Sequence, residues 1–225
     1  MTTGARRAPS ARTSGISPRF LALLDLPSLG GQRAFDVGTG AGRLALVLAA
    51  HARHVIGVDR EGALVVEARR RAAEAGLDNV EFHQADADDV EYTPWAPDLV
   101  TAHLFASDAM IERAGRALSP GGRLAIVAFH RDQWRETGAV SRFAYDEDAM
   151  RERLERAGLQ ARALEVEREE QRFASAEDAL AAAEQHGDRW TADGRLARYR
   201  EFVAAGGRTL TRSHLLVLAV RPARS

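Results

Sequence analysis

Two hydrophobic patterns alternate along the chain from residue 33 to about residue 130. One is a short apolar run bounded by turn residues, which is typical of a buried strand. In the other, apolar residues recur every third or fourth position, which is typical of an amphipathic helix. Strands that alternate with helices predict βαβ units and a mainly parallel sheet. The pattern therefore predicts an α/β domain with helices on both faces of a doubly wound sheet.

The predicted elements follow one another with short connections. The strands are expected at 33–37, 55–59, 80–86, 97–103 and 118–129, the last including its turn. The helices are expected at 16–24, 44–52, 61–75, 110–118 and 146–157. Two later stretches, 160–173 and 210–220, are interpreted as an outer strand and a strongly apolar last strand. Together these elements predict a sheet of seven strands.

The segment between the last two predicted strands is longer than a hairpin requires. Residues 175–186 and 188–205 have the alanine-rich pattern of two helices, and Gly206 and Gly207 end the second. Since a hairpin needs only a few residues, 175–207 is interpreted as a helical insertion. Such an insertion could act as a lid that recognises substrate or as a dimer contact. The sequence supports both readings about equally.

Composition limits the class of protein. The chain has 225 residues, enough for one domain with a full core, which we expect over 16–225 after a disordered tail over 1–15. The net charge of −1 makes a nucleic-acid partner unlikely. No apolar run approaches the roughly 20 residues that span a bilayer, so no membrane partner is expected. The absence of cysteine agrees with a cytoplasmic location.

A glycine-rich turn joins the first strand to the first helix of the alternating region. Gly38, Gly40 and Gly42 occupy every second position, a spacing that differs from the G-x-G-x-x-G of dinucleotide-binding folds. Asp36 lies two residues before the first of these glycines. Its carboxylate would repel a pyrophosphate and attract an ammonium or sulfonium group. The turn therefore predicts a cationic nucleoside ligand without phosphate.

The run from Asp36 to Gly42, which includes Thr39, resembles the first motif of class I S-adenosylmethionine-dependent methyltransferases. The resemblance continues through the strand-end acids and a Leu-x-Pro-Gly-Gly-x-Leu segment that begins at Leu118, so it covers residues 33 to 130. It implies a Rossmann-like fold whose last strand is inserted antiparallel between the fifth and sixth strands. It also implies S-adenosylmethionine as cofactor, with its methionine part held by Asp36 and the glycine turn.

Acidic residues end the second and third predicted strands. Asp59, followed by Arg60, is placed to bind ribose hydroxyls, as acids do in other doubly wound folds. The resemblance implies that Asp86 and the backbone of Ala87 contact the adenine. No cluster of histidines and carboxylates suggests a metal site.

Two histidines end the fourth and fifth predicted strands, where ligands of such sheets bind. His103 is the better candidate for a catalytic base, and for a contact with the cofactor, since an imidazole near its reference pKa suits that task at neutral pH. His130 is the weaker candidate, and a structural role is the alternative for both. Tyr92, Trp95 and Trp134 could line the acceptor pocket, although packing is the commoner role for any one of them.

The resulting hypothesis is methyl transfer from S-adenosylmethionine to a small-molecule acceptor by in-line displacement. Such a reaction needs alignment more than a catalytic triad, and it needs a general base only if the acceptor must lose a proton. One alternative is a protein that binds the cofactor without catalysis, as a sensor or partner subunit. A nucleic-acid methyltransferase ranks lower, because Thr101-Ala-His-Leu stands where such enzymes carry an Asn/Asp-Pro-Pro motif. A homodimer stays open.

Overall fold

The structure, a computed structural model, describes residues 15–223. The expected tail over 1–15 lies outside the described residues, apart from Gly15. The described strands form one sheet in the order β3-β2-β1-β4-β5-β8-β7, and β6 pairs with the end of β5. The strands are β1 (Arg33–Val37), β2 (His54–Asp59), β3 (Val80–Gln84), β4 (Leu99–His103), β5 (Arg123–His130), β6 (Ala144–Tyr145), β7 (Gln160–Arg172) and β8 (Thr209–Val220).

Strands β1 to β5 are parallel, and β8 lies antiparallel between β5 and β7. This arrangement confirms the doubly wound sheet and the antiparallel last strand. The two-residue strand β6 was not expected; it forms because the chain after β5 returns beside Phe129 and His130. The third strand ends at Gln84, so Asp86 lies in the loop after this strand rather than on the strand itself.

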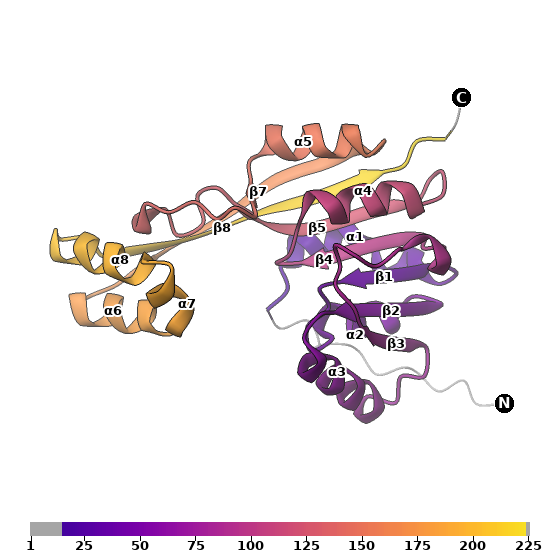
Figure 1. Ribbon diagram of the computed structural model, residues 1–225, viewed down its shortest axis with the longest axis horizontal. Helices are drawn as coiled ribbons and strands as arrows, with labels where there is room; N and C mark the ends of the chain where they lie inside the picture. Colours follow the sequence, from indigo (N-terminus) through magenta and orange to yellow (C-terminus); the bar gives the residue numbers. More distant parts are fainter. Residues whose placement is uncertain (1–14, 224–225) are drawn as a thin grey trace.

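Helices cover both faces of the sheet (Figure 1). Two apolar cores, one on each face, hold the helices against the strands. Because the central strands are buried on both faces, they are almost continuously apolar, as parallel sheets require. On one face lie α1 (Pro18–Leu24), α2 (Arg43–Ala49) and α3 (Gly62–Glu74), and on the other α4 (Asp108–Ala117) and α5 (Glu147–Arg156).

The insertion between β7 and β8 forms three helices with a small core of their own. These helices are α6 (Ala176–Glu184), α7 (Gly187–Ala192) and α8 (Arg195–Ala204). The single helix expected over 188–205 is therefore wrong: the chain breaks at Gly194, whose φ of 75° lies in the left-handed region that favours glycine. Trp190 and Tyr199 fill the core of the insertion. Figure 1 shows it at the far end of the long β7–β8 ribbon.

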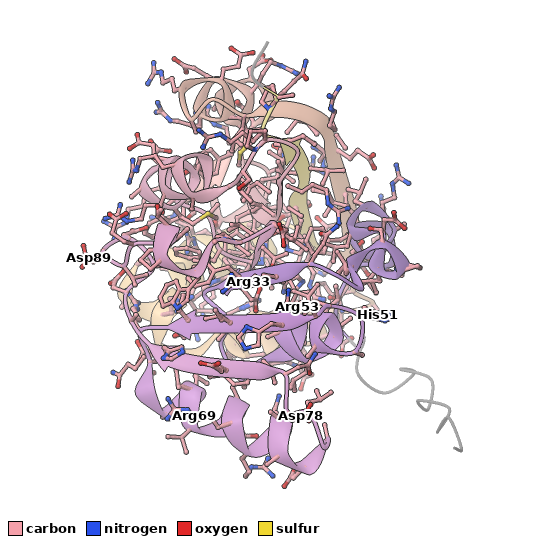
Figure 2. All side chains as sticks on the ribbon, turned by 90° about the vertical axis from the view of Figure 1, so that its right-hand side faces the viewer. Arg33, His51, Arg53, Arg69, Asp78 and Asp89 are labelled. Carbon is pink, nitrogen blue, oxygen red and sulfur yellow. The ribbon has the colours of Figure 1, made fainter. Side chains whose placement is uncertain are left out.

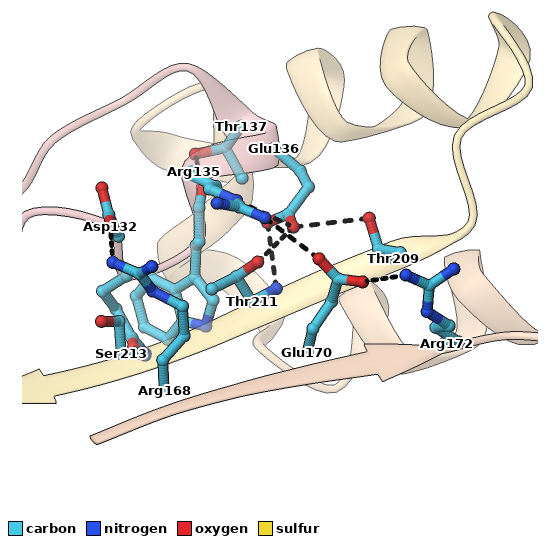
Figure 3. Close-up of polar contacts among 12 residues, drawn as sticks. Asp132, Arg135, Glu136, Thr137, Arg168, Glu170, Arg172, Thr209, Thr211 and Ser213 are labelled. Atoms are coloured by element: carbon cyan, nitrogen blue, oxygen red, sulfur yellow. Dashed lines mark hydrogen bonds and ion pairs between the residues drawn. The ribbon is translucent and has the colours of Figure 1, made fainter. Parts of the chain in front are cut away.

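Polar contacts tie the β7–β8 ribbon to the loop after β5 (Figure 3). The Glu136 side chain is only 4% exposed. Its carboxylate accepts hydrogen bonds from the amide of Thr211 at 3.0 Å and from its hydroxyl at 2.5 Å. Arg135 pairs with Glu170 on β7 at 3.0 Å. Breaking the hydrogen bonds of a buried carboxylate is costly. The β7–β8 ribbon is therefore held in a defined orientation relative to the loop after β5.

The two edges of the sheet differ in their side chains. Figure 2 shows Arg33, His51 and Arg53 at the edge where the parallel strands begin. At this edge the Asp98 carboxylate accepts a hydrogen bond from the amide of Arg33 at 2.9 Å. The strand-end acids and His103 lie at the opposite, carboxyl edge. Within residues 15–223, no helix is both long and apolar enough to cross a membrane.

The packing of α4 against the end of α5 depends on a glycine. A Cβ atom on Gly115 would lie 2.2 Å from the carbonyl oxygen of Ala157, a backbone atom that cannot rotate away. We expect Gly115→Ala to lower the free energy of unfolding by about 1–3 kcal/mol through overpacking, measured by urea denaturation. Gly30→Ala is the control, since Gly30 has a φ of −54° and no atom within 4 Å of the added Cβ. Equal stability of the two variants would contradict this packing argument.

Candidate functional site

Three cavities adjoin one another at the carboxyl edge of the sheet, where ligands of doubly wound folds bind. The large cavity has a volume of about 590 Å³ and is lined by Gly38, Asp59, Arg60, Asp86, Ala87, Asp88, Leu104, Phe105, Ala106, Phe129, Arg142, Phe143 and Arg189. The loop cavity, of about 290 Å³, is lined by Asp36, Gly38, Thr39, Gly40, Ala41, Arg43, Leu44, Arg71, His103 and Leu104. The α1 cavity, of about 280 Å³, is lined by Gly15, Ile16, Ser17, His103, Leu104, Val127, Glu167, Glu169, Arg212 and His214.

Leu104 is common to all three cavities. Its backbone has a φ of 60°, a left-handed conformation that is unfavourable for a leucine, and its amide donates to the carbonyl of Val127 at 2.8 Å. Strain of this kind collects at functional sites, where the surrounding structure holds it. The three cavities therefore form one branched site that meets at the end of β4.

The glycine loop has the conformation that its sequence implies. Gly38 and Gly40 have φ values of 64° and 55°, and a Cβ atom on Gly40 would meet no atom within 4 Å. The space above Gly40 is thus open to the loop cavity. Gly42 has a different role, because a Cβ atom there would lie 3.1 Å from Ala68 and from Phe82. Gly42 lets α3 and β3 pack closely beneath the loop.

Asp36 is buried beneath the loop that it precedes, with an exposed fraction of 1%. Its two carboxylate oxygens accept hydrogen bonds, each at 2.7 Å, from the hydroxyls of Thr39 and Thr101. Burial raises the pKa of Asp36 to about 6, against the opposing effect of these hydrogen bonds. The carboxylate therefore connects the glycine loop to β4 while it also lines the loop cavity.

Asp59 supports the same loop from β2. One carboxylate oxygen accepts from the amide of Gly40 at 2.8 Å, and the other accepts from the amide of Glu61 at 2.9 Å. Each oxygen has a second lone pair, so the carboxylate can still accept from two ribose hydroxyls in the large cavity. Arg60 is exposed beside it, with its Nε 3.4 Å from Glu61. The expected ribose contact fits this geometry.

The loop after β3 forms the wall expected to meet the adenine. The Asp86 carboxylate accepts from the amide of Asp88 at 2.9 Å. The hydroxyl of Tyr92 donates to the Ala87 carbonyl at 2.8 Å, and Asp88 also accepts from the hydroxyl of Ser107. These bonds hold the backbone of the loop in place, as recognition of a flat base requires.

His103 lines both the loop cavity and the α1 cavity. Burial lowers the pKa of His103 to about 4, and the positive charge of Arg43 contributes. The expectation of a pKa near the reference value is therefore wrong, because the fold removes this imidazole from water. His103 is neutral at pH 7, so it can accept a hydrogen bond beside a cationic ligand without charge repulsion.

The other aromatic and histidine candidates are occupied in packing. His130 is 7% exposed, and its Nδ1 accepts from the amide of Asp132 at 3.2 Å. Tyr92 and Trp95 both pack on Phe35, with ring centroids 4.7 and 4.6 Å apart. Trp134 packs edge-on against Trp190 of the insertion, at 5.1 Å. The acceptor-lining role considered for Tyr92, Trp95 and Trp134 is not supported by these positions.

The sequence reasoning missed several residues that line the site, and they come from segments far apart in the chain. Arg43 follows the glycine loop and stands at the position where a dinucleotide-binding motif would have its third glycine. The others carry no sequence signal of their own. They are Phe105, Phe129, Arg142, Phe143 and Arg189.

Known proteins share this fold and parts of this sequence. A family model described as a methyltransferase domain matches residues 29–173. The demethylmenaquinone methyltransferase of Clavibacter sepedonicus is 36% identical over 104 residues, 44% of this chain and 42% of that protein. The S-adenosyl-L-methionine-dependent Diels-Alderase iccD of Talaromyces variabilis is 33% identical over 124 residues, 52% of this chain and 42% of that protein. The match to each of these curated relatives spans less than half of its length.

Among solved structures, a protein from Bacillus halodurans C-125 superposes with a TM-score of 0.73. It is 20% identical, and the alignment covers 92% of this chain and all of that one. At this identity the likeness concerns the fold alone.

The raised pKa of Asp36 leads to a prediction about ligand binding. Below about pH 6 the carboxyl is protonated in the free protein, and a cationic ligand favours the ionised form. Binding of S-adenosylmethionine should then release a proton and should strengthen as the pH rises from about 5 to about 7. Calorimetry in two buffers of different ionisation enthalpy measures the release.

Asp36→Asn is the matched variant for this measurement, and it should bind with little pH dependence over the same range. A pH dependence that survives in Asp36→Asn would assign the proton to another group.

Proposed function

We propose that this chain, which belongs to the methyltransferase-domain family, transfers a methyl group from S-adenosylmethionine to a small-molecule acceptor. The family match confirms the resemblance to class I S-adenosylmethionine-dependent methyltransferases that the sequence carries. The relative named as a demethylmenaquinone methyltransferase supports a small-molecule acceptor. The observation that carries the proposal is the branched cavity that joins the glycine loop, Asp59 and Asp86 to the end of β4.

The residues present fit the cofactor. The Asp59 carboxylate would accept from the ribose, and the loop of Asp86 and Ala87 would hold the adenine. The open space at Gly40 would admit the methionine part, with the ionised Asp36 beneath it. Arg43 lines the same cavity and would pair with the methionine carboxylate. The volume of the large cavity lies in the usual range for small-molecule sites.

The chain's contribution to the reaction is mainly alignment. When bound, S-adenosylmethionine supplies an activated methyl group whose transfer requires the acceptor in line with the methyl–sulfur bond. Leu104 lies where the loop cavity meets the other two, and His103 lies where it meets the α1 cavity, so they would help to set that line. If the acceptor must lose a proton, the neutral imidazole of His103 would receive it, as a weaker base than a histidine at its reference pKa because burial lowers its pKa to about 4. The phenylalanines in the wall of the large cavity would exclude water from the part of the site that they line.

A second function uses the same binding site without methyl transfer. One relative is named an S-adenosyl-L-methionine-dependent Diels-Alderase. This name supports the alternative that the chain binds the cofactor and has another activity, or none. Transfer of a labelled methyl group to any acceptor would decide for methyl transfer. Tight cofactor binding without transfer across a broad acceptor panel would decide for the alternative.

The first test is a calorimetric titration with S-adenosylmethionine, S-adenosylhomocysteine and NAD. We expect binding of the first two and none of the third. In Asp59→Ala, cofactor binding should weaken by about 1–3 kcal/mol, the scale of a lost charged hydrogen bond. Asp98→Ala is the control, because Asp98 bonds the backbone at the opposite edge of the sheet. Unchanged affinity in Asp59→Ala would remove the ribose assignment.

A further prediction concerns His103. His103→Ala should reduce turnover about 10²-fold or more if the imidazole is a general base, with a smaller effect on cofactor affinity. Since the pKa of His103 is about 4, wild-type turnover should lose this contribution only as the pH falls toward that value. The control is His51→Ala, at the opposite edge of the sheet. Wild-type turnover in His103→Ala would make His103 a structural residue.

The proposal also covers the role of the helical insertion, the oligomeric state and the location of the protein in the cell. The insertion would serve as a lid over the site, supported by Arg189 in the wall of the large cavity. A homodimer contact through the same helices is the alternative, and analytical ultracentrifugation separates the two. We keep a cytoplasmic location as part of the proposal, to be tested by microscopy of a tagged chain.

A further inference from the structure

Two arginines in the large cavity have no ionic partner. Arg142 comes from the loop before β6, and Arg189 comes from α7 of the insertion. Both side chains are exposed, and among residues 15–223 the structure places no carboxylate within ion-pair distance of either guanidinium. Two cations that line one cavity without an ionic partner among the described residues favour an anionic group on the ligand that fills it.

Part of the wall of the large cavity is aromatic. Phe105, Phe129 and Phe143 line the same cavity. Phe143 is 41% exposed, and the Arg142 guanidinium lies 4.5 Å from the centre of its ring. This contact directs the guanidinium along the ring face. An exposed aromatic wall next to a cation is suited to a ligand with an apolar body and a charged end.

The nucleoside part of the cofactor does not account for these arginines. It carries no anionic group, and its expected contacts in the large cavity, Asp59 and Asp86, are acids. The one carboxylate of the cofactor belongs to its methionine part, which Arg43 would meet in the loop cavity. Arg142 and Arg189 are therefore left for the second ligand.

The helix that carries Arg189 is held in place by the next residue along the chain. Trp190 is 1% exposed, stacks on His186 at 4.2 Å and packs edge-on against Trp134 at 5.1 Å. Trp134 belongs to the loop after β5, so this aromatic cluster fixes α7 to the main domain. Arg189 is thus presented to the cavity by a packed element rather than by a free loop.

We propose that the acceptor is an amphipathic small molecule, with an apolar or aromatic body against the three phenylalanines and a carboxylate or phosphate bound by Arg142 and Arg189. This inference rests on the proposed function in so far as it calls the bound molecule a methyl acceptor. The anion subsite itself does not require methyl transfer. The insertion would then select the substrate through its charge.

The experiment compares three probes that share one apolar body: 2-naphthoate, 2-naphthyl phosphate and the neutral 2-naphthamide. Binding to the wild-type chain is measured by calorimetry with and without saturating S-adenosylhomocysteine. We expect at least one anion to bind about tenfold more tightly than the amide, the equivalent of one charged hydrogen bond. Which anion binds distinguishes a carboxylate from a phosphate.

The test variant is Arg142→Gln/Arg189→Gln. Its preference for the anion should fall to about twofold or less, and its affinity for S-adenosylhomocysteine should stay at the wild-type value. Arg151→Gln/Arg162→Gln removes the same charge from two positions outside the cavity and should keep the preference.

Four results would overturn the subsite. In the wild-type chain they are equal binding of the amide and both anions, and no anion binding at millimolar concentration. In the test variant they are a preference that survives, and a loss of S-adenosylhomocysteine affinity, which would assign the arginines to the cofactor. If wild-type protein binds neither cofactor but keeps the anion preference, the proposed methyl transfer fails and the subsite stands.

Discussion

The site depends on the hydrogen bonds of one buried carboxylate near the end of β1. Asp36 binds the hydroxyl of Thr39 in the glycine loop and the hydroxyl of Thr101 on β4. Removing a carboxylate from water is costly unless such partners are present. The two hydroxyls, together with the expected cation above them, make that burial tolerable. These bonds hold the glycine loop at a fixed distance from β4, and the loop cavity depends on that distance.

The same loop is held from the other side by Asp59, whose carboxylate accepts from the amide of Gly40. Two acids from adjacent strands therefore position a turn made of small residues. At the end of β4 the backbone of Leu104 is strained, and the three cavities meet there. The proposed cofactor side is built mostly from the first parallel strands, and the proposed acceptor side from later loops and the insertion.

The proposed acceptor side depends on long-range packing. The ribbon of β7 and β8 is tied to the loop after β5 through Glu136, and the insertion is tied to it through Trp134 and Trp190. These contacts place α7 so that Arg189 lines the large cavity. If the charge of Arg142 and Arg189 selects the acceptor, then the inserted part of the architecture sets specificity while the sheet supplies the chemistry.

The sequence alone predicted the strands of the sheet and the glycine loop, because strand periodicity and glycine spacing are local properties. The antiparallel last strand was implied only by the resemblance to class I S-adenosylmethionine-dependent methyltransferases. The sequence also pointed to Asp36, Asp59, Asp86 and His103, which lie at or just after strand ends and so meet at one edge. Only the tertiary structure decided the pKa of His103, since burial by distant segments lowers it. It alone placed Trp134 in a packed cluster and Arg189 in the cavity wall, because the residues that surround each of them come from distant parts of the chain.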